Sequence, residues 1–235
     1  MANHVIKNII SQHAEEASFN WLLRDAAVRE PHYSLNDLAK LDKRVEAHLD
    51  GLRIAGDAGW EICKQELNWE EAGEVFTAAY LAFDSDDALR IHEVLEAGSA
   101  EPELCRGVIS ALGWLPFEQG AKYAKQFLSA DSASLRYFGL AAHAIHRQDP
   151  GQALVEALRS EDTLLKARAL KAVGELGRRD LAAYLQASFR DEDSKCRFYA
   201  AWSAALLGDA YACPILQTIA QADSPYREEA TKMAF

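Results

Sequence analysis

The sequence DTLLKARALKAVGELGRRD, residues 162–180, decides the fold, because it occurs three times in altered form. The copy before it is DSASLRYFGLAAHAIHRQD, residues 131–149, and the copy after it is DSKCRFYAAWSAALLGDA, residues 193–210. Each copy starts with an aspartate, and a cation follows four or five residues later. A fixed period of about 30 residues is typical of helical repeat proteins, in which each unit covers the apolar face of its neighbours.

Four aspartates and four cations define the repeat frame. The aspartates are spaced by 31, 31 and 30 residues, and the cations by 30, 31 and 30. They are Asp131, Asp162, Asp193 and Asp223, and Arg136, Lys166, Arg197 and Arg227. An Asp, Ser or Thr side chain at the start of a helix accepts the free N–H groups of the first turn, so each aspartate or its polar neighbour is expected to cap a helix. We also expect these acids and cations to form a ladder between adjacent hairpins.

A second amphipathic stretch follows each copy. These stretches read PGQALVEALRSE, LAAYLQASFRDE and YACPILQTIAQA. Gly177 and Gly208 lie eleven residues after their cations, where a glycine in left-handed geometry would end the first helix. The sequence therefore predicts an all-α fold, an α-solenoid of stacked helical hairpins (an α-α superhelix).

The period, the order of aspartate and cation, and the ending AVGELG resemble HEAT-like repeats of the phycobilisome-lyase type. The resemblance is specific from about residue 101 onward, and a weaker hairpin is expected within residues 70–98. We therefore assign residues 70–235 to a HEAT-like array whose last repeat, begun at Arg227, is incomplete. This ending suggests a piece of a longer protein with an exposed apolar C-terminal end that favours self-association.

Residues 1–69 do not fit the period and are predicted to be a helical N-terminal cap or a diverged first repeat. Apolar spacing and the Ser34 cap signal predict helices over 11–29, 34–56 and 59–67. Phe19, Leu22 and Leu23, and the tryptophans Trp21, Trp60 and Trp69, are expected in the core of this segment. The stretch from His13 to Cys63 resembles the N-terminal signature of an uncharacterised bacterial family of HEAT-like proteins. Family members are often encoded beside type VI secretion genes, which implies an accessory or chaperone-like role.

The composition disfavours several classes of partner. The chain has 235 residues and a formal net charge of -11, which opposes binding to nucleic acid and to anionic membranes. The sequence contains no run of 18 apolar residues that could span a bilayer. Residues 1–10 do not resemble a secretory signal. The four cysteines form no CxxC pair and are expected to be free thiols. We therefore expect a cytoplasmic protein.

Motifs that carry catalysis or bind cofactors are missing from the sequence. It holds no GxGxxG, GxxxxGK[ST], GxSxG or HExxH pattern, and residues 91–94 contain only one His-Glu pair, where di-iron HEAT-type hydroxylases need several. His143 and His146 are three residues apart at interior positions of the frame, so packing is favoured over metal binding. We expect no catalytic residue, no cofactor and no metal site.

The best candidate for a protein-binding surface consists of the residues one and five positions after the cations. These positions hold Tyr137, Lys171, Phe198 and Trp202, and Phe198 with Trp202 would suit an anchor for a partner protein. The alternative is that the rings pack against the adjoining repeat. The leading hypothesis is a non-enzymatic protein-binding scaffold or adaptor. Its rivals are an immunity-type inhibitor of a neighbouring toxin and a HEAT-like lyase-type enzyme.

Overall fold

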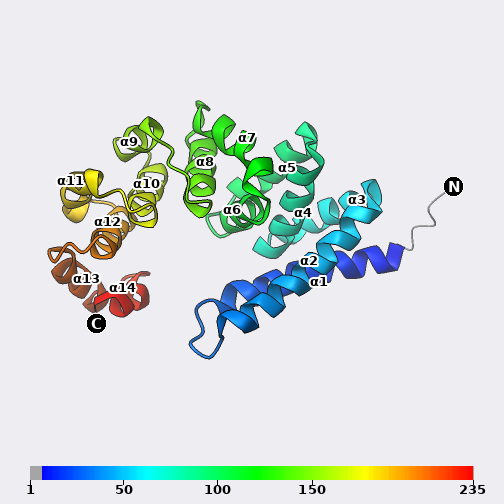
Figure 1. Cartoon of the computed structure of the whole chain (residues 1–235), viewed down its shortest axis with the longest axis horizontal. Helices are drawn as coiled ribbons and strands as arrows, with labels where there is room; N and C mark the ends of the chain where they lie inside the picture. Colours follow the sequence, from blue (N-terminus) through cyan, green and yellow to red (C-terminus); the bar gives the residue numbers. More distant parts are fainter. Residues whose placement is uncertain (1–6, 235) are drawn as a thin grey trace. The chain divides into compact units, whose positions relative to one another are not determined.

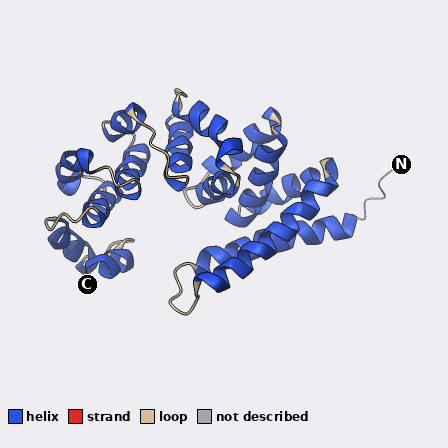
Figure 2. Ribbon diagram, in the orientation of Figure 1, coloured by secondary structure: helices blue, strands red, loops and turns tan. Residues whose placement is uncertain are grey.

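The structure is a computed structural model that describes residues 7–234. All regular secondary structure in this range is helical, which confirms the predicted all-α class (Figure 2). Residues 1–6, part of the segment read for a secretory signal, and Phe235 lie outside the described residues. Among the helices that are described, none is both long enough and apolar enough to cross a membrane.

The chain forms two compact units, residues 1–120 and 121–235. The predicted cap, residues 1–69, lies in unit 1, where α1 packs against α4. The first unit therefore contains the expected cap together with the helices that follow it.

Unit 1 is built on a hairpin of two long helices. Its α-helices are α1 (Lys7–Ala27), α2 (Leu35–Ala55), α3 (Asp57–Glu66), α4 (Ala72–Ser85), α5 (Ala88–Ser99) and α6 (Cys105–Trp114), with a 3-10 turn η1 (Leu67–Trp69) after α3 (Figure 1). Ser34 caps α2 in a capping box with Asp37, as its sequence signal predicts. This capping box satisfies backbone N–H groups at the start of α2 that have no partner within the helix. The chain can therefore begin α2 directly after the turn that follows α1.

Helix α4 is the centre of unit 1, since every residue from Gly73 to Phe83 is buried. Trp21 of α1 stacks on Phe76 with ring centroids 5.1 Å apart. Helix α6 approaches α4 closely at Gly107, where a Cβ atom would lie 2.5 Å from the carbonyl oxygen of Ala72. A glycine is required at this position because any side chain would push the two helices apart.

Two expected core side chains of unit 1 are exposed. The side chain of Phe19 is 62% exposed, because the buried face of α1 is formed by Ala14, Ala17 and Trp21, and Phe19 points away from it. Trp69 is 58% exposed at the end of η1. The core prediction is thus wrong for Phe19 and Trp69, and it is confirmed for Trp21 and for Trp60.

Unit 2 contains the repeated hairpins. It begins within α7 (Phe117–Leu128) and continues through α8 (Ala133–Ile145), α9 (Gln152–Leu158), α10 (Thr163–Glu175), α11 (Ala182–Ala187), α12 (Ser194–Leu206), α13 (Ala212–Gln221) and α14 (Arg227–Ala234). Short 3-10 turns, η2 (Arg179–Leu181) and η3 (Ser188–Arg190), flank α11. The first helices α8, α10 and α12 start 30 and 31 residues apart, so each sequence copy forms one hairpin (Figure 1).

The start of each first helix is capped by a side chain of the repeat frame. Asp162 accepts a hydrogen bond from the N–H of Leu165 at 2.8 Å, and Asp193 accepts one from Cys196 at 2.7 Å. In the first copy the cap is Ser132 rather than Asp131. The expectation that the aspartate or its polar neighbour starts the helix is therefore confirmed for these three copies.

The same frame position ends each first helix in left-handed geometry. Gly177 has φ 69° and Gly208 has φ 85°. The first copy has Arg147 at this position, with φ 55°. A left-handed conformation costs a non-glycine residue about 1 kcal/mol, so the turn geometry is kept in the first copy at some loss of stability. The glycine prediction is confirmed where glycine occurs.

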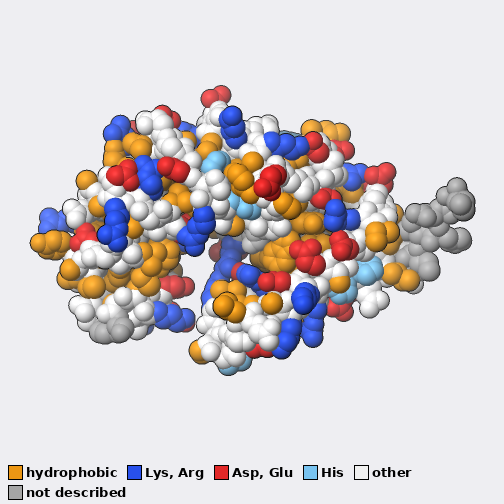
Figure 3. All heavy atoms as spheres, in the orientation of Figure 1, with side chains coloured by type: hydrophobic (Ala, Val, Ile, Leu, Met, Phe, Trp, Pro, Cys, Tyr) orange, Lys and Arg blue, Asp and Glu red, His pale blue; other side chains and the backbone are white. Residues whose placement is uncertain are grey.

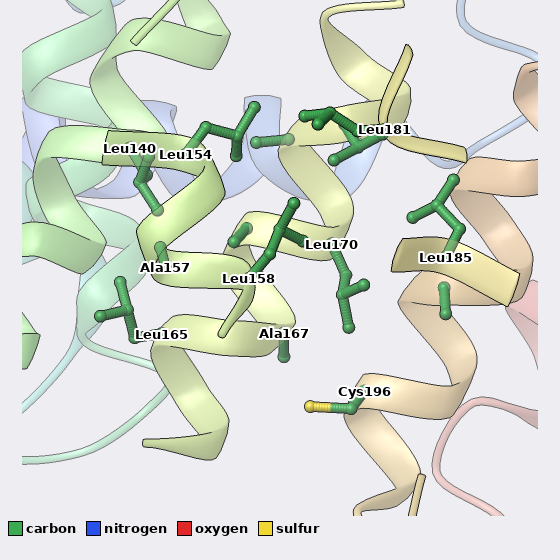
Figure 4. Close-up of a cluster of buried hydrophobic side chains, with 14 of the residues drawn as sticks. Leu140, Leu154, Ala157, Leu158, Leu165, Ala167, Leu170, Leu181, Leu185 and Cys196 are labelled. Carbon is green, nitrogen blue, oxygen red and sulfur yellow. The ribbon is translucent and has the colours of Figure 1, made fainter. Parts of the chain in front are cut away.

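The apolar faces of adjacent hairpins meet in one shared core (Figure 4). The large side chains that form it come from α8 to α11 and include Leu140, Leu154, Leu158, Leu165, Leu170, Leu181 and Leu185. Cys196 of α12 adds a buried free thiol. His143 lies half-buried beside this core, with its Nδ1 2.9 Å from the carbonyl oxygen of Gly139. Each hairpin therefore depends on its neighbours for burial.

Candidate protein-binding surface

Helix α12 carries an apolar stripe formed by Tyr199, Trp202 and Leu206. These residues are three and four positions apart, so their side chains lie on one side of the helix. Leu206 is 49% exposed, and Tyr199 and Trp202 are half-buried. Side chains of this size that remain in contact with solvent at helical spacing are suited to contact with a second protein.

Aromatic contacts hold the stripe in place. The rings of Tyr199 and Trp202 meet edge to face with centroids 6.5 Å apart. Tyr226, which precedes α14, lies 6.1 Å from Tyr199 on another side. The Nζ atom of Lys171, from α10, lies 5.3 Å from the centroid of the Tyr199 ring. The stripe is therefore supported by the helices on both sides of α12.

The equivalent positions on α10 are charged. They hold Arg168, Lys171 and Glu175, and Arg168 donates a hydrogen bond to the Glu175 carboxylate. Lys171 is 3.8 Å from the same carboxylate. On the face that Figure 3 presents, acidic and basic side chains are likewise interspersed with apolar ones. An apolar stripe beside a charged row is the arrangement of a protein interface, with an apolar centre and a polar rim.

The structure assigns different places to the four residues singled out from the sequence. Lys171 and Trp202 lie beside Tyr199. Phe198 is only 3% exposed and stacks on Tyr226, with centroids 4.6 Å apart and ring planes 7° apart. Tyr137 is half-buried with its ring against Phe138. Phe198 packs against the next repeat and is therefore not on the surface. Its neighbour Tyr199 is half-buried and is not among the residues singled out from the sequence.

The expected acid and cation ladder has one inter-repeat link among the described residues. Lys166 of α10 donates to the carboxylate of Asp191, in the loop before α12, at 2.5 Å. Arg197 donates to the carbonyl oxygen of the same Asp191 at 2.5 Å, and the N–H of Asp193 donates to its carboxylate at 3.0 Å. Burial alone would raise the pKa of the Asp191 carboxyl group. The hydrogen bonds from Lys166 and from the N–H of Asp193, together with the charge of Lys166, lower this pKa below its ordinary value. Lys166 thus pairs with Asp191 and not with Asp193, and a pair outside the predicted ladder, Arg178 with Asp149 at 2.7 Å, also joins two copies.

The remaining ladder residues act within their own repeat. Arg227 donates to the carbonyl oxygen of Ala222 at 3.1 Å, just as Arg197 fixes the loop before its own helix. The Nε atom of Arg136 is buried and has no hydrogen-bond partner. Asp131 and Asp223 are exposed. Arg197 and Arg227 thus stabilise the turn that precedes their own helix.

Unit 1 contains a pair of buried carboxyl groups that the sequence did not indicate. Glu66 at the end of α3 is 7% exposed, and Glu74 at the start of α4 is 8% exposed. Burial raises the pKa of Glu66 to about 7, with further contributions from the charges of Glu74 and Glu15. Burial also raises the pKa of Glu74, whose Oε2 atom has no hydrogen-bond partner. In both groups, burial stabilises the neutral form relative to the charged form.

Comparison with known protein families identifies the second unit. Residues 151–234 match the family model for HEAT repeats. Over these residues the chain is similar to HEAT repeats. The match covers the helices from α9 to α14. No curated protein matches the sequence of this HEAT-like protein.

Proposed function

We propose that this HEAT-like protein is a non-enzymatic scaffold that binds another protein through the apolar stripe on α12. The observation that carries the proposal is the helical spacing of half-buried Tyr199 and Trp202 with exposed Leu206. Helical repeat proteins bind partners over extended surfaces made by successive repeats, and the HEAT repeats matched here are a fold of that kind. An amphipathic helix with apolar residues at positions i, i+3 and i+7 would fit such a stripe.

The charges around the stripe support a polypeptide partner over an apolar ligand. The charged residues of α10 lie on one side, and α14 on the other side carries Glu229 and Lys232. Both signs of charge are present, so a partner helix with mixed charges at its edges would find complementary groups. Because its ring already contacts neighbouring side chains, Tyr199 would lose little conformational entropy when the partner binds.

A finer proposal concerns the cellular role. The resemblance of residues 13–63 to proteins encoded near type VI secretion genes supports a cytoplasmic accessory or chaperone-like adaptor of that system. An immunity-type inhibitor remains the rival within the same binding function. The two differ in their partner, because an adaptor would capture a secretion component, whereas an inhibitor would capture a toxin and protect cells that produce it.

Affinity capture with substituted chains tests the proposed surface. The full chain and its Leu206→Lys variant are immobilised and exposed to a lysate of the organism that encodes them. Leu164→Lys is the matched control, since Leu164 of α10 is 48% exposed, close to the 49% of Leu206, and lies outside the stripe. We expect Leu206→Lys to lose a partner that the control retains. Retention of the same partner by both variants would exclude the stripe, and mass spectrometry of the partner separates adaptor from inhibitor.

A further inference from the structure

Two histidines face each other between the long helices of unit 1. His13 lies on α1 and His48 on α2, and their Nδ1 atoms are 3.1 Å apart in a hydrogen bond that one ring donates and the other accepts. The ring centroids are 5.2 Å apart and the ring planes are inclined by 59°. Both side chains are half-buried, so one side of the pair remains open to solvent.

The backbone of α2 fixes the position of the His13 ring. Gly51 lies one turn after His48, and a Cβ atom at Gly51 would be 2.8 Å from three atoms of the His13 imidazole. The absence of a side chain at Gly51 therefore lets the ring pack directly on the backbone of the opposite helix. This contact places the imidazole without any need for a charged partner.

The nitrogen separation fits two ligands of one metal ion. Imidazole nitrogens bind zinc at about 2.0–2.1 Å, so two of them at an angle of 90–110° are about 2.9–3.4 Å apart. We propose that His13 and His48 bind a divalent transition metal ion, such as Ni²⁺, Zn²⁺ or Cu²⁺, through their Nδ1 atoms. The ion would replace the hydrogen bond between the rings, with the donor ring changing to the tautomer that carries its proton on Nε2, and it would connect α1 to α2. Imidazole is a preferred ligand for these three metals.

The surroundings favour a bound cation. Glu16, one turn after His13, carries a negative charge that acts on His48 and favours a nearby cation. Within residues 7–234, no group of three or more His, Cys, Asp or Glu side chains is arranged to hold a metal ion. The proposed site therefore has two protein ligands, and water would complete the coordination.

Titration of the full chain with NiCl₂ and ZnCl₂ at pH 7.5 tests the site. Calorimetry is expected to show saturable binding of one ion per chain. At a metal concentration of about 100 Kd, the Tm of the transition that reports on unit 1 should rise by about 10 °C. His13→Gln and His48→Gln should each abolish both effects. His143→Gln is the matched control, because His143 and His146 are the other closely spaced histidine pair, and it should leave both effects unchanged.

Two results would overturn the proposal. One is unchanged binding by both His13→Gln and His48→Gln, and the other is loss of binding in His143→Gln alone. If the substituted chains do not fold, pulsed electron paramagnetic resonance of the Cu²⁺ complex of the unsubstituted chain decides the question. Coupling to the nitrogens of two imidazoles supports the site, and a spectrum without imidazole coupling excludes it.

Discussion

Replacing Glu66 with glutamine should stabilise unit 1 at neutral and alkaline pH. The folded protein raises the pKa of Glu66 from 4.5 to about 7. A shift of one pKa unit corresponds to about 1.4 kcal/mol, so the ionised carboxylate destabilises the folded state by up to about 3 kcal/mol. Because the raised pKa belongs to the folded state, the stabilising effect of the bound proton is complete below pH 4.5 and is lost as the pH rises through 7.

Glutamine has the shape of the protonated acid and carries no charge, so Glu66→Gln should keep the packing and remove the pH dependence. We expect the variant to exceed the unsubstituted chain in free energy of unfolding by about 1–3 kcal/mol at pH 8, since charge-repulsion from Glu74 and Glu15 is also relieved. The difference should shrink toward zero near pH 4. Urea unfolding followed by circular dichroism at several pH values measures it.

The matched control is Glu61→Gln, which removes a carboxylate from the exposed side of the same helix, α3. This change should alter the free energy of unfolding by less than about 0.5 kcal/mol at both pH values. The reasoning is refuted if Glu66→Gln and Glu61→Gln show the same pH profile, because burial of Glu66 would then have no energetic consequence.

Four further measurements test other parts of the structure. Phe198→Ala should lower the free energy of unfolding of unit 2 by about 3–5 kcal/mol in urea, since it removes a buried ring stacked on the next repeat. Gly107→Ala should destabilise unit 1 by about 1–3 kcal/mol, because its methyl group would meet the carbonyl of Ala72; an unchanged midpoint would contradict the close approach of α6 to α4. The lowered pKa of His48 predicts a loss of stability as the pH falls below its ordinary value of 6.5, and this loss should be smaller in His48→Gln. Sedimentation velocity should detect self-association at rising concentration that Met233→Lys in α14 weakens, whereas a monomer at every concentration would rule it out.

The repeat architecture could be predicted from the sequence because its signals are local. Caps such as Asp162 and Asp193, and stops such as Gly177 and Gly208, each act within one turn of helix, so their spacing fixes the helix ends. Arg147 shows the limit of this reasoning. It occupies the stop position of the first copy without being a glycine, because the surrounding repeat imposes the left-handed geometry.

The individual residues of the candidate protein-binding surface could not be predicted from the sequence. Phe198 and Tyr199 are adjacent on α12, and which ring is covered depends on where Tyr226 packs, which the periodicity does not specify. The predicted ladder does not include Asp191, the acid that Lys166 contacts, for a similar reason. The positions that correspond to Asp191 in the two earlier copies, 129 and 160, hold serine. An acid at this position is therefore not part of the repeated pattern.

The buried groups of unit 1 are harder still to anticipate. Glu66 and Glu74 flank the η1 turn and look like surface acids in the sequence, because nothing near them signals burial. His13 and His48 are 35 residues apart and meet only when α1 and α2 pack. Such pairs depend on tertiary contacts and not on any local pattern.

The core that adjacent hairpins share in unit 2 has a mechanical consequence. Its principal contacts join successive hairpins, as between α8 and α10 and between α10 and α12. Force applied to the C-terminus would therefore peel hairpins away one after another instead of rupturing the whole unit at once. Each step would release about 31 residues, or about 100 Å of extended chain, so stretched single molecules should lengthen in a regular staircase.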